Sequence, residues 1–154
     1  MSRILSIEKK TDEKFLRRKA AEFNFKKFAS KEIRELIKKM RKAMEEANGI
    51  GLAANQVGLD MRVFVAQVEG RFYAVFNPEI TKTSKEAEVA VEGCLSVPEI
   101  MSEVARSYRI TLKGFDKTGK KITIRAWGYL ARVFQHEVDH LNGMLFIDHL
   151  KKRK

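Results

Sequence analysis

Cysteine is almost missing from this sequence: Cys94 is the only one among 154 residues, so no disulfide can form within the chain. Long apolar runs are missing too, because none approaches the ~20 residues that a membrane-spanning helix needs. The first residues, Met1 to Leu5, lack the apolar stretch and the small-residue cleavage site of a signal peptide. These absences predict a protein of the reducing cytoplasm with no membrane partner.

Proline is equally scarce, with only Pro78 and Pro98, and no repeat or Gly/Ser-rich linker divides the chain. With 44% hydrophobic and 33% charged residues, the composition is that of a globular protein rather than a disordered one. We therefore expect a single catalytic domain over residues 1–154.

The net charge of +11 is concentrated at the two ends of the chain. Residues 1–48 hold 15 basic and 8 acidic side chains, residues 151–154 are all basic, and residues 49–150 are balanced. Such ends either form a solvated surface that maintains solubility or attract a polyanion such as ribosomal RNA. No motif for specific DNA binding accompanies them, so we expect none.

The hydrophobic periodicity predicts four elements. Apolar residues recur every three to four positions over residues 30–47, which indicates an amphipathic helix ending at Asn48. Alternating patterns around residues 62–76 and 108–124 indicate two β-hairpins, and a second helix is expected over residues 128–141. Helices combined with hairpins predict an α+β fold, with antiparallel strands packed around the helices.

The pattern His136-Glu137-Val138-Asp139-His140 is the clearest chemical signal in the sequence. Residues four apart lie on one face of a helix, so both imidazoles can reach one metal ion. Glu137 is displaced around the helix, in the position of a general base that contacts water at the metal. Incidental histidines on a surface helix are the simpler alternative.

A third ligand is not specified by spacing alone. The metzincin pattern would require a histidine where Phe146 stands, which excludes that family of zinc proteases. Cys94, His149 and a carboxylate remain as candidates. Cys94 could be a buried small hydrophobe, a nucleophile paired with histidine, or a thiolate ligand. His149 is expected to have a structural or surface role.

Residues 49–58 loosely match a dinucleotide-binding pattern, but a helix precedes them and a hairpin follows, which is the wrong context. We interpret this segment as a loop in which glycine permits close approach of the backbone to a ligand.

Three segments together resemble the peptide deformylase family: Gly49–Gln56 (GIGLAANQ), Glu92–Ser96 (EGCLS) and Gln135–Leu141 (QHEVDHL). Their order and separation also fit, and the similarity extends over roughly residues 33–150. The resemblance implies that Cys94, His136 and His140 hold a metal, usually Fe²⁺, for which Zn²⁺, Ni²⁺ or Co²⁺ can substitute. It implies hydrolysis of the formyl group of N-formyl-methionyl nascent peptides.

The resemblance also implies the roles of the remaining residues. Glu137 would transfer the proton, and the Gln56 amide and the Leu95 backbone N–H would stabilise the oxyanion. The peptide would lie strand-like against Ile50 and Gly93, with its methionine side chain near Val133, and Gly51 would leave that approach open. Gln135 and Asp139 would either orient a metal ligand from outside or simply pack on the helix surface.

The sequence departs from the family at both ends. Residues 8–12 replace a Pro-Asp-Pro stretch, and the chain ends where many bacterial members continue into a C-terminal helix that docks at the ribosome. Ribosome association would therefore depend on the basic ends. Two other functions stay open: a related amidase with a different small acylated substrate, and an RNA-associated protein whose metal is structural.

Overall fold

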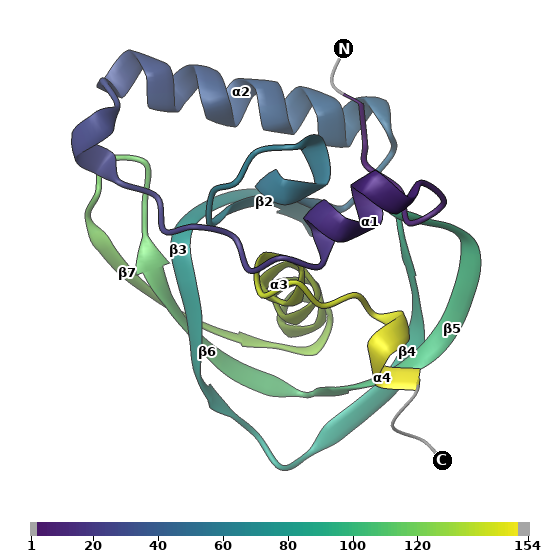
Figure 1. The fold of residues 1–154 in the computed structure, drawn as a ribbon. Helices are drawn as coiled ribbons and strands as arrows, with labels where there is room; N and C mark the ends of the chain where they lie inside the picture. The colour runs from purple at the N-terminus through teal and green to yellow at the C-terminus, as the bar shows by residue number, and fades with distance from the viewer. Residues whose placement is uncertain (1–2, 151–154) are drawn as a thin grey trace.

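The computed structural model describes residues 3–150, which form four α-helices and seven strands. The helix that carries the two histidines is one of the four, and the other elements are arranged around it (Figure 1). Figure 1 shows this helix, α3 (Gly128–Leu141), end-on at the centre, with the strands curving around it. The helices are α1 (Lys10–Leu16), α2 (Ser30–Glu46), α3 and the single turn α4 (Ile147–Leu150), and two 3₁₀ segments cover η1 (Phe25–Lys27) and η2 (Ala54–Val57).

Five strands form one antiparallel sheet in the order β1-β2-β3-β6-β7, and two form a separate hairpin, β4-β5. The sheet contains β1 (Gly51–Ala53), β2 (Val63–Val68), β3 (Arg71–Thr83), β6 (Arg109–Phe115) and β7 (Lys121–Trp127). The hairpin contains β4 (Ala87–Cys94) and β5 (Val97–Ser107). The α+β class predicted from the sequence is confirmed.

The two predicted hairpins and both long helices form close to their expected positions. Register pairs Val68 with Arg71 across the β2–β3 turn and Phe115 with Lys121 across the β6–β7 turn. Asn48, the predicted end of α2, adopts a left-handed backbone with φ 57°, a conformation that asparagine tolerates and that stops a helix.

The prediction of an irregular loop over residues 49–58 is wrong in part. Gly51–Ala53 form β1, which pairs with β2 in the register Gly51 to Ala66, and Ala54–Val57 form η2. A three-residue strand buried on both faces gives no alternation, and Leu52 and Ala53 are fully buried. The pairing places this segment directly beside α3.

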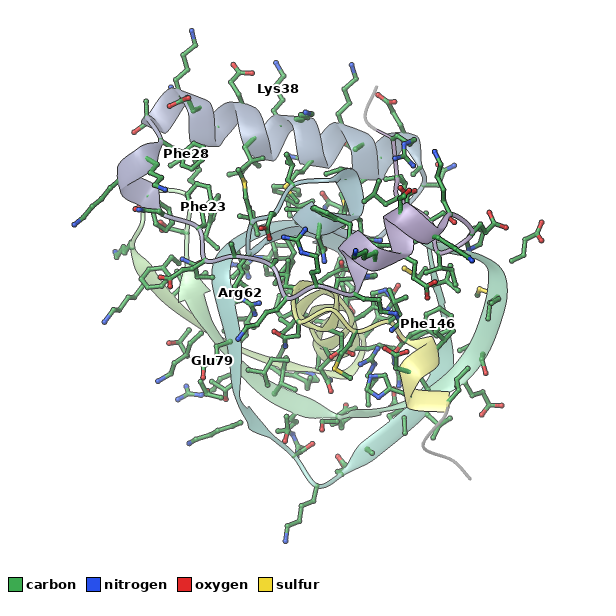
Figure 2. The ribbon with its side chains drawn as sticks, viewed as in Figure 1. Phe23, Phe28, Lys38, Arg62, Glu79 and Phe146 are labelled. Carbon is green, nitrogen blue, oxygen red and sulfur yellow. The ribbon has the colours of Figure 1, made fainter. Side chains whose placement is uncertain are left out.

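Two apolar clusters hold the site in place. The inner face of α3, with Phe134 and Leu141, packs against Phe64 and Leu112 of the sheet. Helix α2 packs the other side of the sheet through Met40 and Met44, over an aromatic group of Phe23, Phe25, Phe28 and Phe76. Figure 2 shows Phe23 and Phe28 beneath α2, whereas Lys38 points away from the protein. No helix among the described residues is long and apolar enough to cross a membrane.

Candidate metal centre

Three potential ligand atoms converge between α3 and the end of β4. His136 and His140 are one helical turn apart, and their Nε2 atoms lie 3.2 Å from each other. The Cys94 Sγ lies 3.2 Å from His140 Nε2, and all three ligand atoms are within 4.8 Å of one another. Tetrahedral ligands of a divalent ion would be separated by about 3.3 Å between nitrogens and about 3.6 Å between nitrogen and sulfur. The cluster therefore fits a metal ion with a Cys-His-His donor set.

Local irregularity in β4 positions the cysteine. The β4–β5 register shifts between Glu92 and Cys94, and Cys94 pairs with Val97 at the tight end of the hairpin. Such a bulge bends the strand and changes the direction of a side chain. Gly93 occupies the bulge, and a Cβ there would collide with the Met101 thioether.

Glu92 fixes the orientation of the first histidine. Its Oε1 lies 2.9 Å from His136 Nδ1, so the Nδ1 hydrogen is directed to the carboxylate and Nε2 faces the other two ligands. Arg106 donates two hydrogen bonds to Glu92, at 2.8 and 2.9 Å, and Arg132 donates one at 2.6 Å. Burial opposes ionisation of Glu92, but the hydrogen bonds from Arg106 and His136 outweigh it and hold the pKa of Glu92 far below its usual range.

Gln135 and Asp139 do not contact the metal-binding imidazoles. The Gln135 amide bonds the backbone N–H and C=O of Ser107 and so ties α3 to β5. Asp139 accepts from Arg106 at 2.6 Å and lies 2.8 Å from His149 Nε2. His149 lies against Asp139 and Arg106, and Asp139 is linked to Glu92 and so to His136 through Arg106.

The thiol of Cys94 is in an environment that favours its thiolate form. Burial raises its pKa, but the charge of His140 and hydrogen bonds from His136 and His140 dominate and hold that pKa well below the usual range. The Gln56 Nε2 and the Ser96 backbone N–H also donate to Sγ, at 3.6 and 3.4 Å. Burial lowers the pKa of His136, yet contacts with Cys94 and Glu92 raise it to about 10. Because metal ligands bind in their deprotonated form, a divalent cation can take the place of the protons on the Cys94 thiol and the imidazoles.

Glu137 lies beside the cluster and is buried. Its Oε1 has no hydrogen-bond partner among the described residues. A Cβ on Gly51 would lie 2.5 Å from its Oε2, so only glycine leaves space for this carboxylate. Burial raises the pKa of Glu137, although the nearby histidines His136 and His140 act in the opposite direction. Such a carboxylate is able to accept and release a proton.

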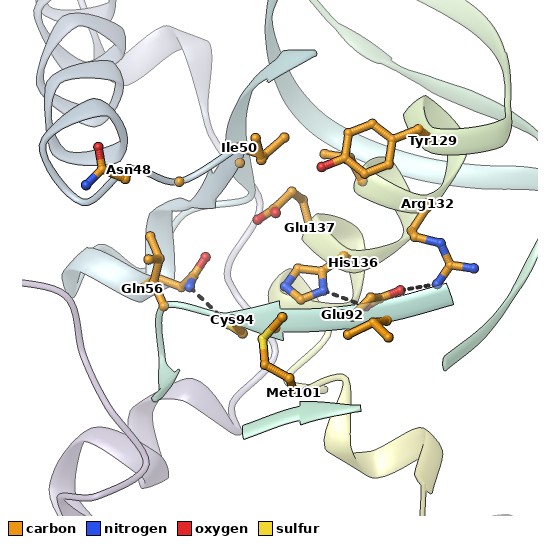
Figure 3. A pocket seen from close by; sticks show the side chains of 16 residues that line it. Asn48, Ile50, Gln56, Glu92, Cys94, Met101, Tyr129, Arg132, His136 and Glu137 are labelled. Carbon is orange, nitrogen blue, oxygen red and sulfur yellow. Dashed lines mark hydrogen bonds and ion pairs between the residues drawn. The ribbon is translucent and has the colours of Figure 1, made fainter. Parts of the chain in front are cut away.

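A cavity of about 430 Å³ opens above these residues. Nine of the ten site residues predicted from the sequence line it, and the tenth, His140, lies buried beneath its floor. The nine are Ile50, Gly51, Gln56, Gly93, Cys94, Leu95, Val133, His136 and Glu137. Figure 3 shows Gln56 and Cys94 at one end of the cavity and Ile50 and Tyr129 at the other.

The sequence analysis missed several residues of this site. Glu92 was part of a recognised segment without an assigned role, and Arg106 and Arg132 were not singled out. Arg132 precedes His136 by four residues, which places both on one face of α3, so helical spacing was an available signal. Tyr129 and Met101, which line the cavity mouth, gave no local signal.

Comparison with known proteins gives a consistent result. Residues 3–154 match the sequence profile described as polypeptide deformylase. The peptide deformylase of Treponema pallidum strain Nichols is 45% identical over 123 residues, which cover 80% of this chain and 76% of that protein. The peptide deformylase of Thermotoga sp. strain RQ2 is 48% identical over 122 residues, covering 79% of this chain and 74% of that protein.

Solved structures agree in fold as well as in sequence. The crystal structure of peptide deformylase from Thermotoga maritima superposes with a TM-score of 0.88 at 42% identity and covers 97% of both chains. The enzyme from Synechococcus elongatus, solved in complex with actinonin, gives a TM-score of 0.87 at 34% identity, covering 96% of this chain and 78% of that one. Together with the Cys-His-His cluster, these matches show that the chain is a metal-dependent hydrolase that belongs to the peptide deformylase family.

Proposed function

We propose that the chain removes the formyl group from N-formyl-methionyl nascent peptides and releases formate. The observation that carries this proposal is the convergence of Cys94, His136 and His140 beside the buried Glu137 at the base of one cavity. Three protein ligands leave a coordination position for water or substrate, whereas a structural site is usually closed by four. This argues against an RNA-associated protein with a structural metal.

The metal would be held by Cys94 Sγ and by the Nε2 atoms of His136 and His140. When bound, a divalent ion supplies a Lewis acid that lowers the pKa of water and polarises the formyl carbonyl. We propose Fe²⁺ as the native ion, because the family resemblance implies it, and Zn²⁺, Ni²⁺ or Co²⁺ as substitutes. The donor set itself suits several of these ions.

Glu137 is proposed as the general base and then the general acid. It takes a proton from the water that attacks the formyl carbon and gives that proton to the departing α-amine as the C–N bond breaks. Its burial keeps bulk water away from the carboxylate, and its Oε1 is not committed to another group among the described residues. Gly51 permits this position because it has no Cβ.

Gln56 and Leu95 are proposed to stabilise the oxyanion. The Gln56 side chain is held from both ends: its Oε1 accepts from the Ala53 N–H at 3.0 Å, and its Nε2 donates to Ser96 Oγ at 3.0 Å. A donor fixed in advance costs little reorganisation when charge develops. The Leu95 backbone N–H follows directly after the Cys94 ligand, and both residues line the cavity.

Ile50, Gly93 and Val133 are proposed to bind the peptide. Ile50, just before β1, and Gly93, in β4, both line the cavity, so the substrate backbone could lie strand-like against them. The Ile50 carbonyl accepts from Gln67 N–H at 2.8 Å, which fixes Ile50 beside the start of β1. Val133, on α3, contributes an apolar wall for the methionine side chain.

We propose further that the protein acts in the cytoplasm and associates with ribosomes through its basic surface. Helix α2 exposes six basic side chains, at positions 31, 34, 38, 39, 41 and 42, against four acidic ones, at positions 32, 35, 45 and 46. Such a surface attracts a polyanion with a strong dependence on salt. The basic residues 151–154 lie outside the described part of the chain. Cosedimentation with ribosomes that weakens steeply as salt is raised would support this association.

Formate release from formyl-Met-Ala-Ser by anaerobically purified protein tests the activity, with bound metal measured in the same sample. We expect rapid release that chelation abolishes and Fe²⁺ restores. No release from a fully metal-loaded sample would instead favour the related amidase.

A further inference from the structure

The β4–β5 hairpin, which carries Cys94, is separate from the five-stranded sheet. The apolar cluster that holds α3 contains side chains of the sheet but none of the described residues 87–107. Val97 and Val104 of the hairpin pack instead with residues that follow the end of α3. The position of Cys94 relative to α3 therefore depends heavily on polar contacts between the helix and the hairpin.

Arg132 makes such contacts with both strands of the hairpin. It lies on α3 one turn before His136 and is buried. Its Nη1 donates to Glu92 Oε2 at 2.6 Å and to Val104 O at 2.9 Å, and its Nη2 donates to Glu88 O at 2.6 Å. One side chain of α3 thus holds β4 at two points and β5 at a third. Figure 3 shows the bond between Arg132 and Glu92.

The other side chains of α3 that bond the hairpin each reach a single strand. Gln135 bonds the backbone of β5, and Asp139 accepts from Arg106 of the same strand. His136 bonds the Glu92 carboxylate of β4. Among the described residues of α3, Arg132 is therefore the one whose side chain bonds β4 and β5 together.

The chemistry of arginine suits this position. A guanidinium group presents its donors in a rigid planar fork, so it can bond a carboxylate and two carbonyl oxygens at once. It is also more weakly hydrated than an ammonium group, which lowers the cost of burial. Arg132 lines the catalytic cavity, and Glu92, which it bonds, precedes Cys94 by only two residues. The fork therefore acts close to the metal ligands on both elements.

We propose that Arg132 is a positioning residue of the metal centre: it fastens both strands of the hairpin to α3 and so sets the distance from the Cys94 thiolate to the imidazoles of His136 and His140. Ligands that are already in place lose less conformational entropy when the metal binds, so the affinity for metal is higher. The inference rests on the metal-binding part of the proposed function and is independent of which substrate the enzyme takes.

The first test compares metal binding by wild-type protein and by Arg132→Leu, which keeps an apolar stem and removes the fork. In competition with a chelator, we expect the folded variant to bind Co²⁺ about 10–100-fold more weakly, the usual effect of losing a group that supports metal ligands. The absorption that thiolate ligation gives to bound Co²⁺ should also weaken. Unchanged affinity and absorption in folded Arg132→Leu would overturn the proposal. Failure of the wild-type protein to bind metal would instead contradict the proposed function.

Two further variants separate positioning from charge and from general stability. Arg132→Lys keeps the charge, but one ammonium group cannot reproduce the fork, so we expect it to recover little of the lost affinity. Gln135→Ala removes two bonds to Ser107, which pairs with Ala87 at the open end of the hairpin, far from Cys94 at the closed end. It should lower the free energy of unfolding in urea and leave metal affinity unchanged. Full recovery in Arg132→Lys, or an equal loss of affinity in Gln135→Ala, would overturn the proposal.

Hydrogen exchange on the wild-type protein covers the case in which Arg132→Leu does not fold. A two-stranded hairpin by itself is marginally stable in water, so protection of its amides reports its attachment to the rest of the protein. We expect the amides of β4 and β5 to stay protected after the metal is removed, because Arg132 holds the hairpin without it. Loss of that protection while α3 stays protected would show that the metal itself holds the hairpin, and would refute the proposal.

Discussion

Replacing Glu92 by Gln should both destabilise the protein and weaken metal binding. The carboxylate is buried and contacts Arg106, Arg132 and His136 at distances between 2.6 and 2.9 Å. Glutamine keeps the size of the side chain but removes its charge and one acceptor. Two buried guanidinium groups then lose their shared anion, and His136 loses the carboxylate that orients its ring.

The structure indicates the size of both effects. Removing one partner of a buried ion pair typically costs about 3–5 kcal/mol. Arg106 keeps Asp139, and Arg132 keeps the carbonyls of Val104 and Glu88, so we expect the lower end, about 3 kcal/mol. Loss of the partner that orients a metal-binding imidazole typically weakens metal affinity by about 10–100-fold.

Urea unfolding of metal-free protein measures the first effect, and competition with a chelator measures the second. Glu88→Gln is the matched control, because Glu88 lies on the same strand with an exposed side chain, and we expect it to stay within about 0.5 kcal/mol of wild type. A Glu92→Gln protein that differs from wild type by less than about 1 kcal/mol and binds metal equally well would refute the reasoning.

The effect of Glu92→Gln on stability should also depend on pH. The folded pKa of Glu92 lies below its unfolded value, so the stability contributed by the carboxylate is fully present above about pH 5 and is lost as pH falls through the folded pKa. The gap in unfolding free energy between wild type and Glu92→Gln should therefore narrow in acid. A gap that widens below pH 4 would contradict this assignment.

Three further changes test the catalytic residues. Glu137→Gln should retain the metal but lower kcat by at least about 10³-fold, measured as formate release with metal content determined in parallel; substantial turnover would exclude Glu137 as the base. Gly51→Ala places a methyl group 2.5 Å from Glu137 Oε2 and should lower kcat/KM by about 100-fold through displacement of the carboxylate, with unchanged metal content. Cys94→Ser should lose most bound metal after dialysis against a weak chelator, because a hydroxyl replaces the thiolate; full retention would show that the two histidines suffice.

Local sequence signals were enough to predict two helices and two hairpins. α3 begins at Gly128 and ends at Leu141, as predicted from the stop signal at Asn142-Gly143, and α2 differs from its prediction by one residue. The β2–β3 and β6–β7 hairpins form around the expected turns, although β3 continues to Thr83. α2, β6 and β7 each have one buried and one exposed side, so their period appears directly in the sequence. β2 and α3 are buried along most of their length, and they were predicted instead from a Val- and Phe-rich segment before a turn and from the Asn142-Gly143 helix stop.

The elements that were missed lack such a signal. β4 and β5 form a hairpin apart from the main sheet, and half of β4 is exposed, including Val89 and Val91. α1 has seven residues, of which only Asp12 and Leu16 are buried. Short or mostly exposed segments are defined by their tertiary contacts rather than by periodicity.

The sequence by itself determined that His136 and His140 would share a helical face with Glu137 beside them, because spacing on one helix is a local property. It left the role of Cys94 open until the family resemblance supplied a third ligand. Only the tertiary structure decided that Cys94, 42 residues before His136, lies within reach of both imidazoles, and that Glu92, Arg106 and Arg132 form one buried ionic group behind them. The physical reason is that these contacts join segments far apart in the chain, and the packing of the whole core brings them together.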